Sequence, residues 1–394
     1  MKRKIIFEDG LVFEGTGFGD MAGRVYEIVF NTSMAGYQEI LSDPSYTDQA
    51  VVMTYPLIGN YGMAADDYET AVPTIGALLV REYNDEPSNF RSEETLDSVM
   101  KRYGIPGVQG IDTRMLTRSI RDHGSRKVLI TDADTTVEAG LKILRGTALP
   151  HNAVSRVSCS KAQICTPEKM TSDMLWSGCS PMQDDHPLTT DDSSKNTAGI
   201  AETEKRETWK RKQVVAIDCG MKENIVRSFL RRGVTVIRVP WNTSAEEIRS
   251  LQPDGIFISN GPGDPTDVPE TIETIRELIG QYPVFGICLG HQIISLAYGA
   301  RTYKLKFGHR GGNHPVRDLE TGKIEITSQN HSYAVDEESL SGTGLSVTHR
   351  NLLDHTVEGV KCERDGVFSV QYHPESAPGP QDSGHLFDRF IRML

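Results

Sequence analysis

Apolar and polar positions change rhythm near residue 213 of this 394-residue chain. Before that point, short apolar segments and turns are followed by two helical patterns, which predicts an α+β part. After it, apolar runs typical of buried strands alternate with helical patterns; the runs cover residues 214–219, 234–239, 255–258 and 284–287. Repeated strand–helix units predict a mostly parallel sheet with helices on both faces, and ligands at the carboxyl ends of its strands.

The same rhythm divides the chain into three segments. Residues 1–157 are the predicted N-terminal domain, and residues 213–394 are the predicted α/β domain. Residues 158–212 are polar, with hardly any aliphatic residues and no clean periodicity, so we interpret them as a linker or surface insertion that is partly disordered. The chain opens on a strand–turn–strand pattern around Asp9 and Gly10, which favours mature protein over a signal peptide.

Capping residues predict where several helices begin and end. Ser92 is the expected N-cap of the first helix, with two glutamates in its first turn. Asp112 is expected to begin the second helix and Gly124 to end it. Ser244, followed three residues later by Glu247, predicts a capping box in the α/β part.

Composition and charge narrow the class of protein. Hydrophobic residues make up 38% of the chain and charged residues 24%, as in ordinary soluble globular proteins. The net charge of −12 argues against a nucleic-acid backbone or an anionic membrane as partner. No apolar run approaches membrane-spanning length. We therefore expect a cytoplasmic protein.

The segment PVFGICLGHQ, residues 283–292, places Cys288 between an apolar strand and a helical pattern. A sharp strand-to-helix turn would push the sulfur out of the sheet, and the helix N-terminus would favour its thiolate. This is the nucleophile-elbow arrangement with cysteine in place of serine. Taken alone, Cys288 would more often be an ordinary buried core cysteine.

Two further segments supply the partners that acyl transfer needs. His373 and Glu375 follow an apolar run and lie two residues apart, so Glu375 can orient the ring while its other nitrogen faces a thiol. The loop SNGPGDP, which contains Gly261 and Gly263, directly follows residues 255–258. Its backbone N–H groups suit an oxyanion hole. Nucleophile, base and oxyanion loop together predict an acyl-transfer site.

These motifs, in this order, resemble class I (triad) glutamine amidotransferases. The segments FNTSMAGYQEILSDPSY at residues 30–46, GIDTR at residues 110–114, and FGH with GGNHP at residues 307–315 narrow the resemblance. They are similar to the small-chain family of carbamoyl-phosphate synthetase. The resemblance covers nearly the whole chain apart from roughly residues 158–212.

The resemblance implies that Cys288 attacks glutamine, His373 handles the protons and Glu375 orients His373. Backbone N–H groups near Gly261 and of Leu289 would hold the oxyanion. The expected glutamine-binding residues are Ser45, Gly261, Gly263, Leu289, Gln292, Asn330, Ser332 and Tyr333. Asn330 to Tyr333 are expected in a turn, and the family commonly has Gly and Phe where this chain has Ser332 and Tyr333. By spacing alone, Ser45 would be a turn serine, and Gln292 would equally well be a core amide.

The resemblance also implies a large partner subunit, in a heterodimer or a higher assembly, that combines ammonia with bicarbonate using ATP. Neither G-x-x-x-x-G-K-[ST] nor G-x-G-x-x-G occurs here, so no cofactor is expected in this chain, and ATP and Mg²⁺ are expected on the partner. The carbamoyl phosphate would serve arginine synthesis, pyrimidine synthesis or both. Two alternatives stay open, a stand-alone γ-glutamyl hydrolase and a non-catalytic regulatory protein on the same fold.

No metal site is expected. His309 and His314 lie close together in sequence, but their glycine-rich setting lacks a neighbouring carboxylate or thiol. His291 follows Cys288 on the same helical pattern and is expected to have a core or positioning role rather than to act as the base. The six cysteines form no C-x-x-C pair, and we expect neither a metal among them nor a disulfide.

Overall fold

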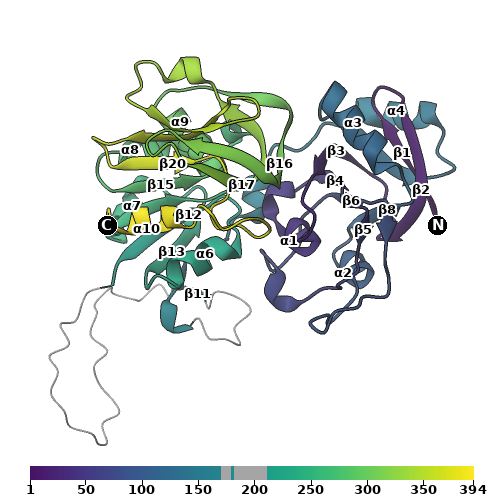
Figure 1. Cartoon of the computed structure of the whole chain (residues 1–394), viewed down its shortest axis with the longest axis horizontal. Helices are drawn as coiled ribbons and strands as arrows, with labels where there is room; N and C mark the ends of the chain where they lie inside the picture. Colours follow the sequence, from purple (N-terminus) through teal and green to yellow (C-terminus); the bar gives the residue numbers. More distant parts are fainter. Residues whose placement is uncertain (170–178, 182–210) are drawn as a thin grey trace, which may run out of the picture.

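The structure, a computed structural model, describes residues 1–169, 179–181 and 211–394. Figure 1 shows an N-terminal part, in purple and blue, beside a C-terminal part, in green and yellow. Residues 170–178 and 182–210 lie outside the described residues, and with them most of the segment expected to be partly disordered. Among the residues described, no helix is both long enough and apolar enough to cross a membrane.

A closed barrel forms the N-terminal part, in the strand order β1-β2-β8-β6-β4-β3-β9. Its strands are β1 (Lys2–Phe7), β2 (Val12–Gly19), β3 (Arg24–Asn31), β4 (Gln49–Met53), β6 (Ala77–Leu79), β8 (Pro106–Gln109) and β9 (Lys127–Asp132). The helices are α1 (Tyr37–Ser42), α2 (Leu96–Arg102), α3 (Thr113–His123), α4 (Val137–Gly146) and α5 (Ala153–Val157), and β5 (Leu57–Ile58) pairs with β7 (Glu82–Tyr83). The expected strand–turn–strand around Gly10 is the antiparallel β1–β2 pair.

Alternating residues of β4 hold this part together. Ala50 and Val52 pack in one buried cluster with Leu116 of α3. Val51, which lies between them, packs in a second cluster with Leu96 of α2. This period of two is what a strand covered on both faces requires.

The described residues of the C-terminal part form one sheet in the order β11-β10-β13-β12-β14-β15-β20-β19-β18-β16-β17. The central strands are parallel: β12 (Gln213–Asp218), β13 (Thr235–Pro240), β14 (Gly255–Ile258), β15 (Val284–Ile287) and β20 (Val367–Val370). Antiparallel strands flank them: β10 (Gln163–Cys165), β11 (Ser180–Pro181), β16 (Thr302–Asp318), β17 (Ile324–Val335), β18 (Ser346–Asn351) and β19 (Val357–Cys362).

Helices cover both faces of the parallel strands, as the sequence predicts (Figure 1). One face packs against α7 (Ala245–Ser250), α8 (Pro269–Leu278) and α9 (Leu289–Ala297), and the other packs against α6 (Glu223–Leu230) and α10 (His385–Ile391). Neighbouring residues of one strand divide between the faces: Ile256 and Ile258 lie in the first cluster, and Phe257 lies in the second. The predicted α/β fold class is confirmed.

Two of the three predicted N-cap residues cap the expected helix. Asp112 caps α3 by accepting a hydrogen bond from the Met115 N–H, and Ser244 forms the expected capping box with Glu247. The prediction for Ser92 is wrong, because α2 is capped by Thr95. The backbone N–H of Glu93 donates instead to the carbonyl of Met63, so this stretch is held in an extended pairing before the helix can begin.

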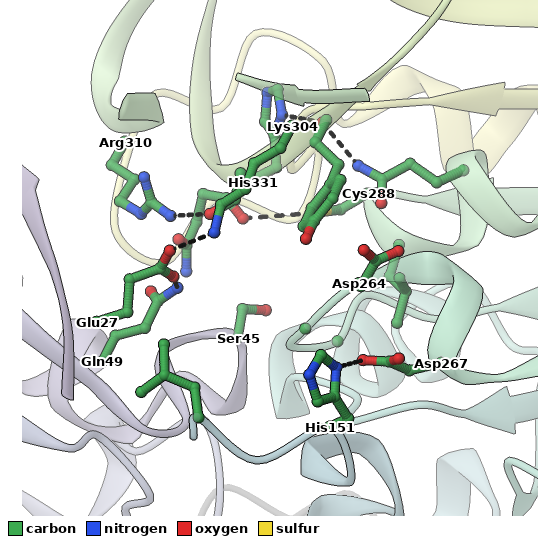
Figure 2. Close-up of a pocket in the computed structure, with 18 of the residues that line it drawn as sticks. Glu27, Ser45, Gln49, His151, Asp264, Asp267, Cys288, Lys304, Arg310 and His331 are labelled. Carbon is green, nitrogen blue, oxygen red and sulfur yellow. Dashed lines mark hydrogen bonds and ion pairs between the residues drawn. The ribbon is translucent and has the colours of Figure 1, made fainter. Parts of the chain in front are cut away.

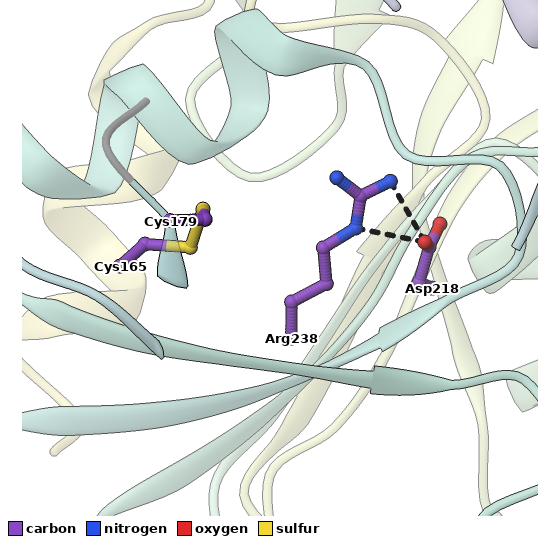
Figure 3. The surroundings of a disulfide bond; sticks show 4 residues. All are labelled: Cys165, Cys179, Asp218 and Arg238. Carbon is purple, nitrogen blue, oxygen red and sulfur yellow. Dashed lines mark hydrogen bonds and ion pairs between the residues drawn. A yellow bond between two sulfur atoms is a disulfide. The ribbon is translucent and has the colours of Figure 1, made fainter. Parts of the chain in front are cut away.

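The segment predicted to be a linker contributes two short strands to the edge of the sheet. Strand β10 pairs with both β13 and β11, and the β10–β11 register places Cys165 opposite Cys179. These two cysteines form a disulfide (Figure 3), which contradicts the expectation of none. The sequence could not indicate this bond, since it depends on the pairing of two short strands within a polar stretch.

Candidate functional site

Four neighbouring parallel strands bring the predicted site together at their carboxyl ends. Lys222 follows β12, the Gly261 loop follows β14, Cys288 follows β15, and His373 follows β20. Because consecutive strands of this set are direct neighbours in the sheet, residues more than 150 positions apart in sequence meet at one edge. This is where the sequence pattern predicted ligands to bind.

Cys288 occupies a strained turn between β15 and α9. Its φ of 55° is unusual for a residue other than glycine, and its side chain is 2% exposed. The turn requires close packing, because a Cβ on Gly290 would lie 2.2 Å from the backbone oxygen of Ile258. Leu289 is the first residue of α9, so its N–H has no acceptor within the helix and can face a developing oxyanion.

His373 and Glu375 make the predicted orienting contact. The Nδ1 atom of His373 lies 2.7 Å from Oε1 of Glu375, and both residues are buried. Burial would lower the pKa of His373, but the attraction of Glu375 and Cys288 outweighs it and raises the pKa to about 10. A protonated His373 beside Cys288 favours the thiolate, as the predicted chemistry requires.

Lys222 is a member of the site that our reading of the sequence missed. Its Nζ donates to Oε1 of Glu375 at 3.0 Å and to the carbonyl of Ser376 at 2.8 Å. Burial works to raise the pKa of Glu375, but Lys222 and then His373 hold that pKa down at about 2. Lys222 follows the carboxyl end of a parallel strand, so the rule that ligands gather at such ends could have identified it.

One pocket contains Cys288 and all eight predicted glutamine-binding residues. Figure 2 shows Cys288 and Ser45 among the residues that line it. Both parts of the molecule line it. The N-terminal part contributes Glu27, Ser45 and Gln49, and also residues 149–151, which lie between α4 and α5. His373 and Glu375 are not among the lining residues, so Cys288 is the triad member that faces a ligand directly.

Hydrogen bonds across the interface place Ser45 in the pocket. Its hydroxyl accepts from Nδ2 of Asn260 at 3.0 Å. Asp43, two residues earlier, accepts from Nδ2 of Asn330 at 2.9 Å, and the Asn330 carbonyl lies 3.6 Å from the Cys288 sulfur. The predicted contribution of an N-terminal serine to the pocket therefore has a geometric basis.

Gln292 makes core hydrogen bonds and also lines the pocket. Its Nε2 donates to the Tyr333 carbonyl at 2.8 Å and to Oε1 of Gln371 at 3.0 Å. These bonds fix the amide and point to the core role. Since Gln292 also lines the pocket, its carbonyl oxygen can accept a hydrogen bond from a ligand.

The turn predicted for residues 330–333 is wrong, because these residues belong to strand β17, which pairs with β16. Ser332 accepts a hydrogen bond from Nη2 of Arg310, a pocket-lining residue of β16 that the sequence did not single out. The Tyr333 hydroxyl interacts with Asp264, another residue that lines the pocket. Ser332 and Tyr333 thus bring two polar contacts to a rim where glycine and phenylalanine would bring neither.

His291 is buried and has the expected core role. Its Nδ1 lies 2.9 Å from the Ser369 hydroxyl. Burial, with His349 nearby, lowers the pKa of His291 to about 3, so the ring is neutral at neutral pH. It does not line the pocket with Cys288.

The expectation that His309 has no neighbouring carboxylate is wrong, because folding brings Asp354 and Glu358 close to its ring. His309 Nε2 lies 2.8 Å from Asp354, and Nδ1 lies 3.5 Å from Glu358. The ligand atoms of His309, His331 and Glu358 lie within 4.8 Å of one another. Both nitrogens of His331 already contact protein oxygens, at 2.7 and 2.6 Å. These contacts describe an ion-paired polar cluster rather than an open coordination site.

We expect His309→Asn to destabilise the protein more at pH 6 than at pH 10. Burial disfavours the charged ring, but the contacts with Asp354 and Glu358 outweigh it and raise the pKa of His309 from 6.5 to about 9. The protonated His309 ring stabilises the folded state fully below its unfolded pKa of 6.5, and this stabilisation is lost as the pH rises through 9. It should amount to about 1–2 kcal/mol, given that Asp354 is partly exposed. Urea unfolding at the two pH values measures this, with the exposed His123→Asn as control. An equal loss at both pH values would contradict it.

Comparison with known proteins agrees with the geometry. Residues 5–130 match the family model described as carbamoyl-phosphate synthase small chain, CPSase domain, and residues 215–393 match glutamine amidotransferase class-I. The pyrimidine-specific small chain of carbamoyl phosphate synthase from Bacillus subtilis is 48% identical over 100% of this chain and 96% of its own length. The small chain from Fusobacterium nucleatum is 48% identical over 100% and 98%. The pyrimidine-specific chain from Halalkalibacterium halodurans is 50% identical over 100% and 97%.

Proposed function

We propose that this chain, which belongs to the carbamoyl-phosphate synthase small-chain family, is the glutamine-hydrolysing subunit of such a synthase. The observation that carries the proposal is the position of Cys288. It lies at a strained strand-to-helix turn, faces a pocket, and has a histidine held by a buried carboxylate behind it. A nucleophile, an oriented base and oxyanion donors are the set that amide hydrolysis through an acyl-enzyme needs.

In the proposed reaction, the Cys288 thiolate attacks the carboxamide carbon of glutamine. The carbonyl oxygen becomes an oxyanion, which the N–H groups of Leu289 and the Gly261 loop stabilise. Gly261 suits close backbone approach, since a Cβ there would lie 2.2 Å from the carbonyl oxygen of Cys219. The tetrahedral intermediate collapses to a glutamyl thioester, and His373 gives its proton to the departing ammonia.

Water completes the cycle. His373, now neutral, takes a proton from water as the water attacks the thioester carbon, and the thiolate leaves. Glutamate is released, and the imidazolium–thiolate pair is restored. Glu375 and Lys222 touch neither substrate nor water in this scheme; they position His373 and set its proton affinity.

The ammonia passes to a large partner subunit. Free ammonia at neutral pH would be mostly protonated and no longer nucleophilic, so we propose an enclosed transfer to the subunit that uses ATP, Mg²⁺ and bicarbonate. No phosphate-binding glycine motif occurs in this sequence, which agrees with assigning ATP to the partner.

We expect the isolated chain to hydrolyse glutamine slowly and the large subunit to accelerate it. The N-terminal part supplies Ser45 to the pocket and has no nucleophile of its own, so partner binding there can favour the competent pocket. The test is to measure glutamate release with and without the large subunit. It includes an acid quench during turnover to trap labelled glutamate on Cys288.

The outcomes of this test separate the alternatives. Fast hydrolysis that the partner does not change would indicate a stand-alone γ-glutamyl hydrolase. No glutamate release and no trapped thioester in the assembled enzyme would indicate a non-catalytic protein on the same fold. Acceleration by the partner with a trapped thioester on Cys288 supports the proposal.

A further inference from the structure

Arg310 differs from three other cations of the described chain that are buried or largely buried. Arg3, Lys222 and Arg238 each form an ion pair with a carboxylate: Asp132, Glu375 and Asp218, respectively. Arg310 is 3% exposed, yet no ion pair joins it to a carboxylate among the described residues. A buried charge without a counterion is costly, so its persistence suggests that the counterion arrives with a ligand.

The contacts of Arg310 leave part of its guanidinium unused. Nη1 donates to the Phe307 carbonyl at 2.8 Å, and Nη2 donates to the Ser332 hydroxyl. Nε is buried and has no hydrogen-bond partner within residues 1–169, 179–181 and 211–394. These two neutral acceptors fix the plane of the guanidinium without cancelling its charge. Each Nη atom keeps a second N–H, and these remaining donors can bind an anion.

The location of Arg310 identifies the ligand. It lines the same pocket as Cys288 and Ser45 (Figure 2). Gln292 lines this pocket as well. Lys304 also lines the pocket, but its ammonium group is already paired with Glu27 of the N-terminal part. Glu27 also attracts Arg310 electrostatically, but it lies beyond ion-pair distance from Arg310 and is engaged by Lys304.

We propose that Arg310 binds the α-carboxylate of glutamine and selects substrates that carry one. This inference rests on the proposed function, since it assigns one group of the same substrate. Glutamine has two ends, a carboxamide that must reach Cys288 and an α-amino acid end that must be fixed elsewhere in the pocket. Arg310 supplies the positive charge for the carboxylate, and Ser332 keeps the guanidinium in place.

The test compares two substrates in the assembled enzyme. Glutamine carries the α-carboxylate, whereas 4-aminobutanamide has the same chain, ammonium and carboxamide without it. For Arg310→Met we expect kcat/KM for glutamine to fall by about 30-fold or more, chiefly through KM. We expect kcat/KM for 4-aminobutanamide to change less than about threefold. Arg310→Lys, which keeps the charge but loses the fork, should lie between wild type and Arg310→Met.

Arg3→Met is the matched control, because it removes a buried, paired guanidinium that does not line the pocket. It should leave the ratio of the two substrates unchanged. Ser332→Gly should raise KM for glutamine less than Arg310→Met does. Equal losses for both substrates in Arg310→Met, with the fold intact by circular dichroism, would overturn the inference. If Arg310→Met does not fold, the same comparison in Arg310→Lys decides. Failure of the wild-type enzyme to hydrolyse glutamine would instead overturn the proposed function.

Discussion

Cys288→Ser is expected to abolish glutamine-dependent carbamoyl phosphate synthesis while the assembled enzyme still uses added ammonia. Serine fits the strained turn at φ 55°, but its hydroxyl does not ionise in the range where a thiol does. His373 and Glu375 remain in place without a nucleophile to activate. The loss should be on the order of 10³-fold or more in glutamine hydrolysis. Ammonia bypasses the thioester, so its use should stay within about twofold of wild type.

The measurement pairs two assays on one preparation, glutamine-dependent and ammonia-dependent synthesis. Cys362→Ser is the control, since Cys362 is another buried free cysteine of the same sheet that lies outside the pocket. It should keep both activities. Residual glutaminase activity near wild type in Cys288→Ser would show that another group attacks glutamine. Loss of ammonia-dependent synthesis in a folded, assembled variant would show that Cys288 acts outside the first half-reaction.

The central part of the site could be predicted because the information is local. A strand, a turn and a helix around Cys288 are encoded in ten consecutive residues, and so is the proximity of His373 to Glu375. Repeated strand–helix units then fix where these segments must meet, because the carboxyl ends of parallel strands lie at one edge. Local capping patterns likewise predicted the helix beginnings at Asp112 and Ser244 correctly.

What escaped prediction depends on contacts between distant segments. Thr95 rather than Ser92 caps α2 because Glu93 pairs with Met63 from another loop. The carboxylates beside His309 come from residues more than forty positions away. The Cys165–Cys179 disulfide requires the β10–β11 register. In each case the side chains can be read from the sequence, but which of them come into contact is decided by the tertiary structure.

Arg310 and Lys222 illustrate the same limit inside the site. Neither belongs to a motif that local chemistry would single out, and each becomes informative only when its partners are known. Lys222 has a buried carboxylate at 3.0 Å, and Arg310 forms no ion pair with any carboxylate of the residues that the structure describes. The first therefore belongs to the machinery that positions the base, and the second belongs to ligand binding.

Lys222→Met is expected to lower glutamine hydrolysis by about 10²-fold or more and to destabilise the fold by about 3–5 kcal/mol. Methionine has a similar length but no charge, so Glu375 would remain buried beside His373 without its cation. Lys222 is the largest influence that holds the pKa of Glu375 down at about 2. Without it the pKa of Glu375 should rise. Once Glu375 takes up a proton it is neutral and no longer stabilises the His373 imidazolium, so His373 should support less of the Cys288 thiolate at neutral pH.

The decisive measurement is the pH dependence of Cys288 alkylation by iodoacetamide, followed on the Cys288 peptide by mass spectrometry. In Lys222→Met the apparent pKa of alkylation should move upward, and glutamine hydrolysis should fall with it. Arg238→Met removes a largely buried cation, the partner of the buried Asp218, and controls for loss of stability alone. Its alkylation profile should match that of wild type. An unshifted profile in a folded Lys222→Met variant would mean that Lys222 only fills space behind Glu375 and has no part in setting the proton affinity of His373.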